Sequence, residues 1–144
     1  MKQLLMSGAL CVLAVAGFAH SGVQNEAVLE RMDAMKTTGD ALKVIGNMAK
    51  GTTTFDAAAA RMAAEEIARE ADRTPDLFEA RETDPKSEAK PAIWKSFEDF
   101  TAKAETLETV AQDVSTSLET RADLGPAMAS LGEACKSCHT SYRE

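Results

Sequence analysis

Cys135-Lys136-Ser137-Cys138-His139 stands near the end of the 144-residue chain and has the pattern C-x-x-C-H. This pattern is the attachment motif for c-type haem. On a helix, cysteines three residues apart lie on one face, so both sulfurs can form thioether bonds along one edge of a haem. The imidazole of His139 then lies below the ring and can bind the iron from its proximal side. The motif therefore predicts one covalent haem c.

Three other interpretations of the motif are weaker. A structural zinc site needs four ligands, but beyond Cys11 the chain offers only Cys135, Cys138, His139 and His20. A thioredoxin-like pair opens a helix in a β-α-β setting, and no strand pattern precedes this pair. A plain disulfide leaves His139 without a role.

The N-terminus has the features of a secretory signal peptide, which we assign to residues 1–19. Lys2 precedes a mostly apolar run over residues 4–18, which is short for a membrane span. Small residues before the expected cleavage site place the cut after Ala19. The mature chain, residues 20–144, is then one domain exported to the periplasm, where c-type haem is attached in bacteria.

The chain is acidic. It has 16 Lys and Arg and 23 Asp and Glu residues, for a formal charge of −7. Removal of the leader takes away Lys2 alone among these, which makes the mature chain one unit more negative. This charge argues against nucleic acid and anionic membranes as partners. Cys11 leaves with the leader, so both remaining cysteines belong to the haem motif.

Four stretches carry a helical period, and no stretch shows a convincing strand alternation. Helices are expected over about residues 25–50, 55–71, 91–115 and 126–142, with an irregular connector over residues 72–90. Gly51 after Lys50 is a good stop for the first helix, and the threonines at 52–54 are expected to cap the second. The pattern predicts an all-α fold, an antiparallel up-down-up-down four-helix bundle.

Apolar residues recur at gaps of four and three and define the expected inner faces. In the first helix these residues are Val28, Met32, Met35, Gly39, Leu42, Ile45 and Ala49. In the second helix they are Phe55, Ala59, Met62, Ala63 and Ile67.

The topology predicts which residues surround the haem. The C-terminal part of the last helix lies level with the N-terminal parts of the first and third helices. The expected haem neighbours are Arg31, Met35, Trp94 and Phe97, with Ile67 from the second helix.

Three of the side chains near the haem have a predicted role. Met35 is the candidate distal ligand of the iron, and Arg31, one turn before it, is expected to pair with a propionate. Arg143 is expected beside the imidazole of His139 or near a propionate. The alternative for Met35 is a packing role, and Met32 is almost as well placed as Met35. The alternative for both arginines is an ordinary surface position.

Four motifs in this order resemble the class II c-type cytochromes, the cytochrome c′ family. They are Arg31-x-x-x-Met35-Lys36, Met48-Ala49-Lys50-Gly51, Pro91-Ala92-Ile93-Trp94 and Cys135-x-x-Cys138-His139-x-x-Tyr142-Arg143. The resemblance covers essentially the whole mature chain. It implies a periplasmic haem protein that is often a homodimer through its first two helices.

The resemblance also implies two alternative states of the iron. Low-spin members place a methionine of the first helix on the iron and carry electrons. High-spin members leave the iron five-coordinate and bind nitric oxide or carbon monoxide. The family's distal position falls on Met35.

The favoured hypothesis is a periplasmic monohaem cytochrome that carries electrons between redox partner proteins and is not an enzyme. The alternative is a five-coordinate protein that binds diatomic gases. A third interpretation, an exported helical bundle with an incidental motif, makes no use of haem.

Overall fold

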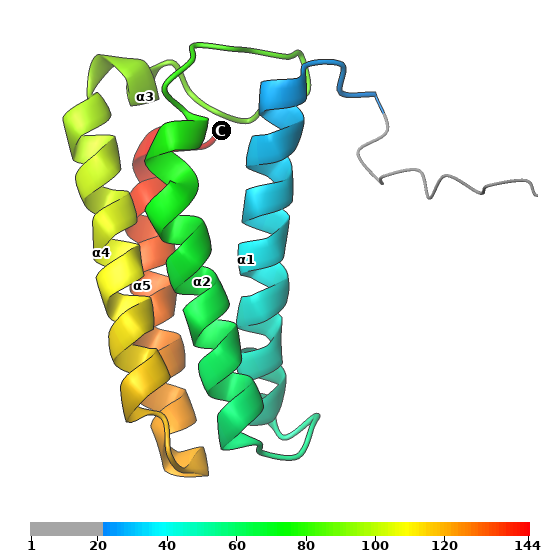
Figure 1. The fold of residues 1–144 in the computed structure, drawn as a ribbon, viewed down its shortest axis with the longest axis vertical. Helices are drawn as coiled ribbons and strands as arrows, with labels where there is room; N and C mark the ends of the chain where they lie inside the picture. Colours follow the sequence, from blue (N-terminus) through cyan, green and yellow to red (C-terminus); the bar gives the residue numbers. More distant parts are fainter. Residues whose placement is uncertain (1–21) are drawn as a thin grey trace, which may run out of the picture.

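The computed structural model describes residues 22–144, which form an elongated helical bundle (Figure 1). The predicted signal peptide, Cys11 and His20 lie outside the described residues. The elements are α1 (Glu26–Lys50), α2 (Ala57–Leu77), the short α3 (Ala92–Lys95), α4 (Phe97–Ser117), the 3₁₀ turn η1 (Arg121–Asp123) and α5 (Leu124–Tyr142). Within residues 22–144 the only β-type pairing is an isolated bridge between Ala89 and Arg143.

The four long helices confirm the predicted up-down-up-down bundle. In Figure 1, α1 and α4 descend and α2 and α5 ascend, and each long helix packs against its antiparallel neighbours. The long connection from α2 to α3, the short α3 and the C-terminus all gather at the upper end. The haem motif, at the end of α5, therefore lies beneath that connection.

The first helix begins and ends where the sequence predicts. The side chain of Asn25 caps it by accepting a hydrogen bond from Val28 N at 3.0 Å. At the other end Gly51 has φ of 75°, a left-handed conformation that glycine adopts without steric cost.

The second helix differs from its prediction at both ends. Its cap is Asp56, which accepts from Ala59 N at 3.0 Å, and not one of the threonines. It continues beyond Ala71 to Leu77, through Pro75 in its last turn. Thr74 is buried with 6% of its surface exposed; packing of this last turn overrides the local tendency of a proline to end the helix before it.

The third predicted helix is interrupted near its start. Ser96, with φ of −134° and ψ of 49°, separates α3 from α4. Its main-chain carbonyl accepts from Phe100 N at 3.0 Å and so begins the new helix. The break allows Ile93 on one side and Phe100 on the other to be buried in the same cluster.

The inner face of α1 is rotated from the predicted one. Val28 and Ile45 are buried as expected, but the other buried side chains between them are Arg31, Ala34, Thr38 and Ala41. Met35 is 37% exposed, and Met62 of α2, also predicted inside, is 66% exposed. Ala34 and Ala41 are small residues that let α1 and α2 approach closely, which large methionines at the contact would prevent.

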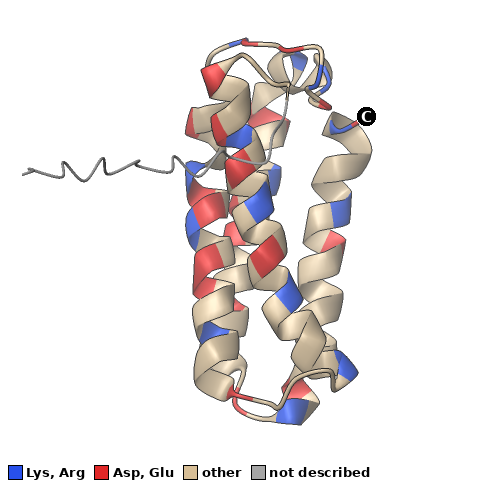
Figure 2. Cartoon of the chain, turned by 90° about the vertical axis from the view of Figure 1, so that its right-hand side faces the viewer, with Lys and Arg blue, Asp and Glu red and all other residues tan. Residues whose placement is uncertain are grey.

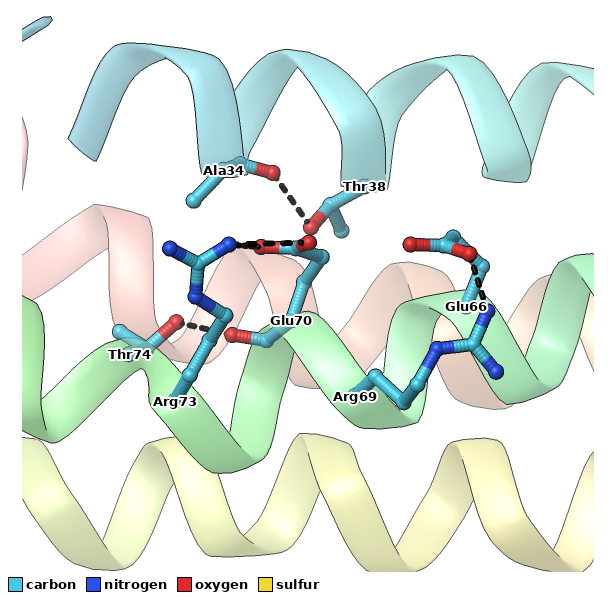
Figure 3. A network of polar contacts seen from close by, with 7 residues as sticks. All are labelled: Ala34, Thr38, Glu66, Arg69, Glu70, Arg73 and Thr74. Carbon is cyan, nitrogen blue, oxygen red and sulfur yellow. Dashed lines mark hydrogen bonds and ion pairs between the residues drawn. The ribbon is translucent and has the colours of Figure 1, made fainter. Parts of the chain in front are cut away.

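Three buried polar residues at the contact of α1 with α2, which are Thr38, Glu70 and Thr74, are paired within their own helices (Figure 3). Thr38 Oγ1 donates to Ala34 O at 2.9 Å, and Thr74 Oγ1 donates to Glu70 O at 2.6 Å. The buried carboxylate of Glu70 accepts from Arg73 Nη1 at 3.3 and 3.4 Å. Because an unpaired buried polar atom is costly, this pairing is what allows polar side chains between these helices.

The core divides into two clusters along the bundle. The lower cluster is aliphatic and includes Ile45, Ile67, Leu124 and Leu131, each with at most 1% of its surface exposed. The upper cluster is aromatic and contains Phe78, Ile93, Phe100 and Tyr142, with Trp94, Phe97 and Cys138 packed against it. Cys138 thus connects the haem motif to the aromatic cluster, whereas Ile67, a predicted haem neighbour, belongs to the lower cluster.

Candidate haem site

The two cysteines of the motif stand three residues apart near the end of α5, and both are free thiols of intermediate exposure. Partial burial raises the pKa of both thiols, and for Cys138 the nearby charge of Lys103 opposes that rise. Lys103 lies across the groove between α4 and α5, with Nζ 3.4 Å from Ser137 Oγ. The thiols therefore lie at the flank of the bundle, where a flat group attached to both has one edge near the surface.

His139 follows Cys138 and is available as a neutral imidazole. Loss of hydration lowers its pKa, the positive charge of Arg143 lowers it further, and the charge of Glu88 opposes both effects. Neutral imidazole is the form that binds a metal ion. Arg143 is therefore close to the imidazole, as one of its two predicted positions requires.

Arg143 itself is held by Glu88, with Nε 2.6 Å and Nη2 2.5 Å from Oε2. Main-chain bonds add to this contact: Lys90 N donates to Tyr142 O and Glu144 N donates to Glu88 O, both at 2.9 Å. The last turn of α5 is thereby fixed against residues 88–90, which orients the motif. A contact of Arg143 with a propionate stays a prediction.

The register of α1 against α5 places Met35 level with His139. A Cβ on Gly46 would lie 3.5 Å from the terminal methyl group of Met128, so these residues face each other. Both helices rise by the same distance per residue and run in opposite directions. Counting seven residues back from Gly46 along α1 and seven forward from Met128 along α5 brings Gly39 level with Cys135. Counting four more residues in the same directions brings Met35 level with His139.

Gly39 has open space beside its backbone, so a bulky group attached to the cysteines would meet no side chain at this position. A Cβ on Gly39 would have no heavy atom within 4 Å, in contrast to the close contact at Gly46. Met35, one turn away, is 37% exposed. The donor set of His139 and Met35, with the two cysteines and this space, fits a covalently attached haem.

Arg31 has a position that the sequence did not predict. Its side chain donates to three main-chain carbonyls, Nε to Leu77 O at 2.8 Å, Nη1 to Glu82 O at 2.8 Å and Nη2 to Ala80 O at 2.6 Å. The guanidinium carbon lies 4.6 Å from the ring centroid of Phe78 and 5.6 Å from that of Trp94. Only 3% of Arg31 is exposed, and desolvation lowers its pKa.

These bonds make Arg31 the link between α1, the end of α2 and the segment above the haem motif. An arginine has five N–H groups, so two are left for other partners, and the predicted propionate contact stays a prediction.

Trp94 is half-buried and donates from Nε1 to Phe78 O at 2.7 Å. It packs against the aromatic cluster, as Cys138 does.

The sequence reasoning missed two contacts of the site, the Arg143–Glu88 pair and the bond from Tyr142 Oη to Asp99 Oδ2 at 2.5 Å. Tyr142 belongs to the quoted C-terminal motif, but its polar partner lies 43 residues away. Nothing in local spacing points to such a partner.

Comparison with known proteins decides the family. The family described as Cytochrome C′ matches residues 26–143. The chain belongs to the cytochrome c′ family. Cytochrome c-556 of Agrobacterium fabrum is 37% identical to this cytochrome over 140 residues, which cover 96% of this chain and 90% of the relative. Cytochrome c′ of Pararhodospirillum photometricum is 36% identical over 125 residues, which cover 83% of this chain and 98% of the relative.

Comparison with solved structures supports the same family assignment. Cytochrome c′ from Rhodopseudomonas palustris superimposes with a TM-score of 0.78 at 29% identity, over 84% of this chain and 98% of that chain. Oxidised cytochrome c556 from the same organism gives a TM-score of 0.76 at 26% identity, over the same two shares. This cytochrome therefore has the four-helix fold of its family and carries a covalent haem c. None of the helices within residues 22–144 combines the length and the apolar character that crossing a membrane requires.

The first prediction concerns attachment of the haem in this cytochrome. Two thioether bonds should hold the haem through acid–acetone extraction and denaturing electrophoresis. Cys135→Ala and Cys138→Ala should each leave a single bond or lose the haem, as judged by haem staining of the gel. Ser137→Ala, between the two cysteines, is the control and should keep the full haem content. Haem extracted from the native protein would contradict covalent attachment.

The second prediction concerns Arg31. Arg31→Met removes three hydrogen bonds to carbonyls of the cytochrome but keeps much of the buried hydrocarbon. It should lower the free energy of unfolding by about 3 kcal/mol, because the carbonyls lose their partner. Urea unfolding of the holoprotein, followed by circular dichroism, measures the change.

Arg69→Met is the matched control for this experiment. Arg69 is an exposed arginine of α2, 62% exposed in its side chain, paired with Glu66 one turn away. Its replacement should change the free energy of unfolding by no more than about 0.5 kcal/mol. Equal effects of the two substitutions would show that the carbonyl contacts of Arg31 contribute little.

Proposed function

We propose that this cytochrome carries electrons in the periplasm through its haem, with His139 as the proximal ligand and Met35 as the distal ligand of the iron. The observation that carries the proposal is the antiparallel register of α1 on α5, in which Gly46 lies beside Met128. Counted along both helices, this register leads us to expect Met35 at the level of His139. The similarity to proteins named cytochrome c-556 supports it.

The residues around the motif suit a carrier better than a catalyst. When bound, the haem supplies one electron and takes it back as its iron changes between ferrous and ferric states. Cys135 and Cys138 are half-buried, so a haem attached to them presents an edge to an approaching protein. A thioether from Met35 favours the reduced state and raises the reduction potential. The function then needs only approach of a redox partner and no substrate site.

The partners proposed are other exported redox proteins. The leader over residues 1–19 directs the chain out of the cytoplasm, and the C-x-x-C-H motif requires the compartment in which haem is attached. Basic and acidic positions are interspersed along the helices (Figure 2). Such a mixed surface of net negative charge favours neither nucleic acid nor an anionic membrane.

The alternative is a five-coordinate haem that binds nitric oxide or carbon monoxide. The observation that favours it is the 37% exposure of Met35. Similarity to proteins named cytochrome c′ is equally compatible with this function. The two functions differ in whether the Met35 sulfur occupies the distal position.

The third prediction separates these functions. If Met35 binds the iron, the reduced native protein should show a low-spin absorption spectrum and bind carbon monoxide slowly. Met35→Ala should then change the spectrum to high-spin and speed carbon monoxide binding, because the distal position opens. Stopped-flow absorption measures both quantities.

Met32→Ala is the internal control, since Met32 lies on the same helix but not at the register of His139. It should alter stability and leave the spin state unchanged. A high-spin spectrum of the reduced native protein would disprove ligation and favour gas binding.

We also propose that the outer face of α1 and α2 joins two copies of this cytochrome. A shallow apolar groove runs between these helices, lined by Thr37, Asp40, Ala41, Val44, Ala59, Met62, Ala63 and Glu66. Met62 is 66% exposed and Val44 39% exposed, which is costly for large apolar side chains in water.

Charge supports a second copy as the occupant of this groove. Asp40 accepts from Lys36 at 2.6 Å and from Lys43 at 2.8 Å, and Glu66 pairs with Arg69 in the view of Figure 3. The groove thus has both signs of charge at its rim. A two-fold axis brings the same patch against itself, and such a rim can then pair acidic with basic groups.

The fourth prediction tests this interface. Met62→Glu places a charge in the centre of the groove and should convert a dimer to a monomer in analytical ultracentrifugation. The matched control is Ala102→Glu on the exposed side of α4, which should leave the dimer intact. A native protein that sediments as a monomer at high concentration would rule the interface out.

A further inference from the structure

The single tyrosine of the chain lies beside the haem motif and has a carboxylate partner. Tyr142 is 6% exposed, and its hydroxyl donates to Asp99 Oδ2 at 2.5 Å. This distance lies at the short end of the range of about 2.5–2.7 Å for a hydroxyl that donates to a charged oxygen. The pair joins the last turn of α5 to the first turn of α4.

The ring of Tyr142 is one end of a chain of aromatic contacts. It meets Phe100 edge-on at 5.4 Å between centroids, and Phe100 lies 5.0 Å from Phe78. Phe78 in turn lies 6.4 Å from Trp94, the single tryptophan. Cys138, which holds the haem, packs against this same cluster. Tyr142 therefore belongs to the same cluster as a haem-attaching cysteine without being one of the proposed iron ligands.

We propose that Tyr142 and Asp99 form a redox-active pair that supplies an electron to the haem when hydrogen peroxide oxidises it. This role goes beyond electron carriage between proteins. It requires the covalent haem but is independent of whether Met35 binds the iron. Its effect is to remove an oxidising equivalent from the haem before the macrocycle is damaged.

The electrons and protons balance when the reaction begins with ferrous haem. Hydrogen peroxide accepts two electrons and two solvent protons and leaves as two molecules of water. The bound haem would supply one of these electrons. Tyr142 supplies the other: its O–H bond breaks, the electron goes to the haem, and the proton goes to Asp99 Oδ2. A neutral tyrosyl radical and a protonated Asp99 remain.

Two features make Tyr142 better suited to this role than Trp94. Burial, with the hydrogen bond to Asp99 second, raises the pKa of Tyr142 to about 12, so the phenol keeps its proton until the electron leaves. Asp99 then accepts that proton as a base, and its side chain, 58% exposed, can release it to water. Trp94 donates instead to a main-chain carbonyl, which is a far weaker base.

The fifth prediction is an electron paramagnetic resonance experiment on the reduced holoprotein. One equivalent of hydrogen peroxide is mixed with the native protein and with Met35→Ala, in which the peroxide reaches the iron more readily, and both are frozen within milliseconds. A tyrosyl radical signal is expected, and it should narrow when the protein contains ring-deuterated tyrosine. Because the chain has one tyrosine, narrowing assigns the signal to Tyr142 without any substitution.

Substitutions then test each partner. Tyr142→Phe keeps the ring against Phe100 and should abolish the signal and bleach the haem several-fold faster. Asp99→Asn keeps an oxygen acceptor but not a base and should lower the radical yield several-fold. Glu98→Gln removes a neighbouring carboxylate that does not contact Tyr142 and is the control, with an unchanged yield.

Two results would overturn the proposal. Absence of a tyrosyl signal from both the native protein and Met35→Ala would exclude Tyr142 as the donor. Equal radical yields from Asp99→Asn and Glu98→Gln would exclude Asp99 as the proton acceptor. Peptide mass spectrometry after peroxide treatment gives a second readout, in which oxidation should appear at Tyr142 and not at Trp94.

Discussion

The upper half of this cytochrome depends on the buried guanidinium of Arg31. A cation in an apolar environment must have hydrogen-bond partners, because its desolvation is costly. Arg31 finds them in three carbonyls at the end of α2 and in the segment after it. The same contacts keep Phe78 and Trp94 against the cation and fix the cover above the haem motif. The aromatic cluster adjoins this group through Phe78 and Trp94. The end of α5 packs on the same cluster through Tyr142 and Cys138.

The division of the core explains why the haem belongs where it does. The lower cluster is aliphatic and closely packed around residues such as Ile45 and Leu131, which have no exposed surface. The upper cluster is aromatic, and Cys138 lies at its margin. At this level a Cβ on Gly39 would have no heavy atom within 4 Å, and Met35 is 37% exposed. A large flat group attached to the cysteines supplies the apolar contacts that the side chains leave unmade.

Local patterns in the sequence predicted the number of long helices, their antiparallel order and the haem attachment residues. The helix predictions succeeded where a physical effect acts over a few residues, as at the glycine stop at residue 51 and in the apolar period of α4. The roles of Cys135 and Cys138 in haem attachment stay predictions, which the family assignment supports. The helix predictions failed where partners are remote. The predicted end of α2 was too early because the burial of Thr74 outweighs the proline that follows it. The predicted inner face of α1 was rotated from the observed one because the close approach of α2 favours small residues there.

The sequence by itself determined that this chain is a four-helix haem protein, since the motif and the helical period need no tertiary information. The tertiary structure alone decided which side chains face one another. It paired Arg31 with carbonyls, Tyr142 with Asp99 and Arg143 with Glu88. The physical reason is that hydrogen bonds and ion pairs between distant segments depend on the relative rotation and register of packed helices, and these are set by the shapes of all the residues between them.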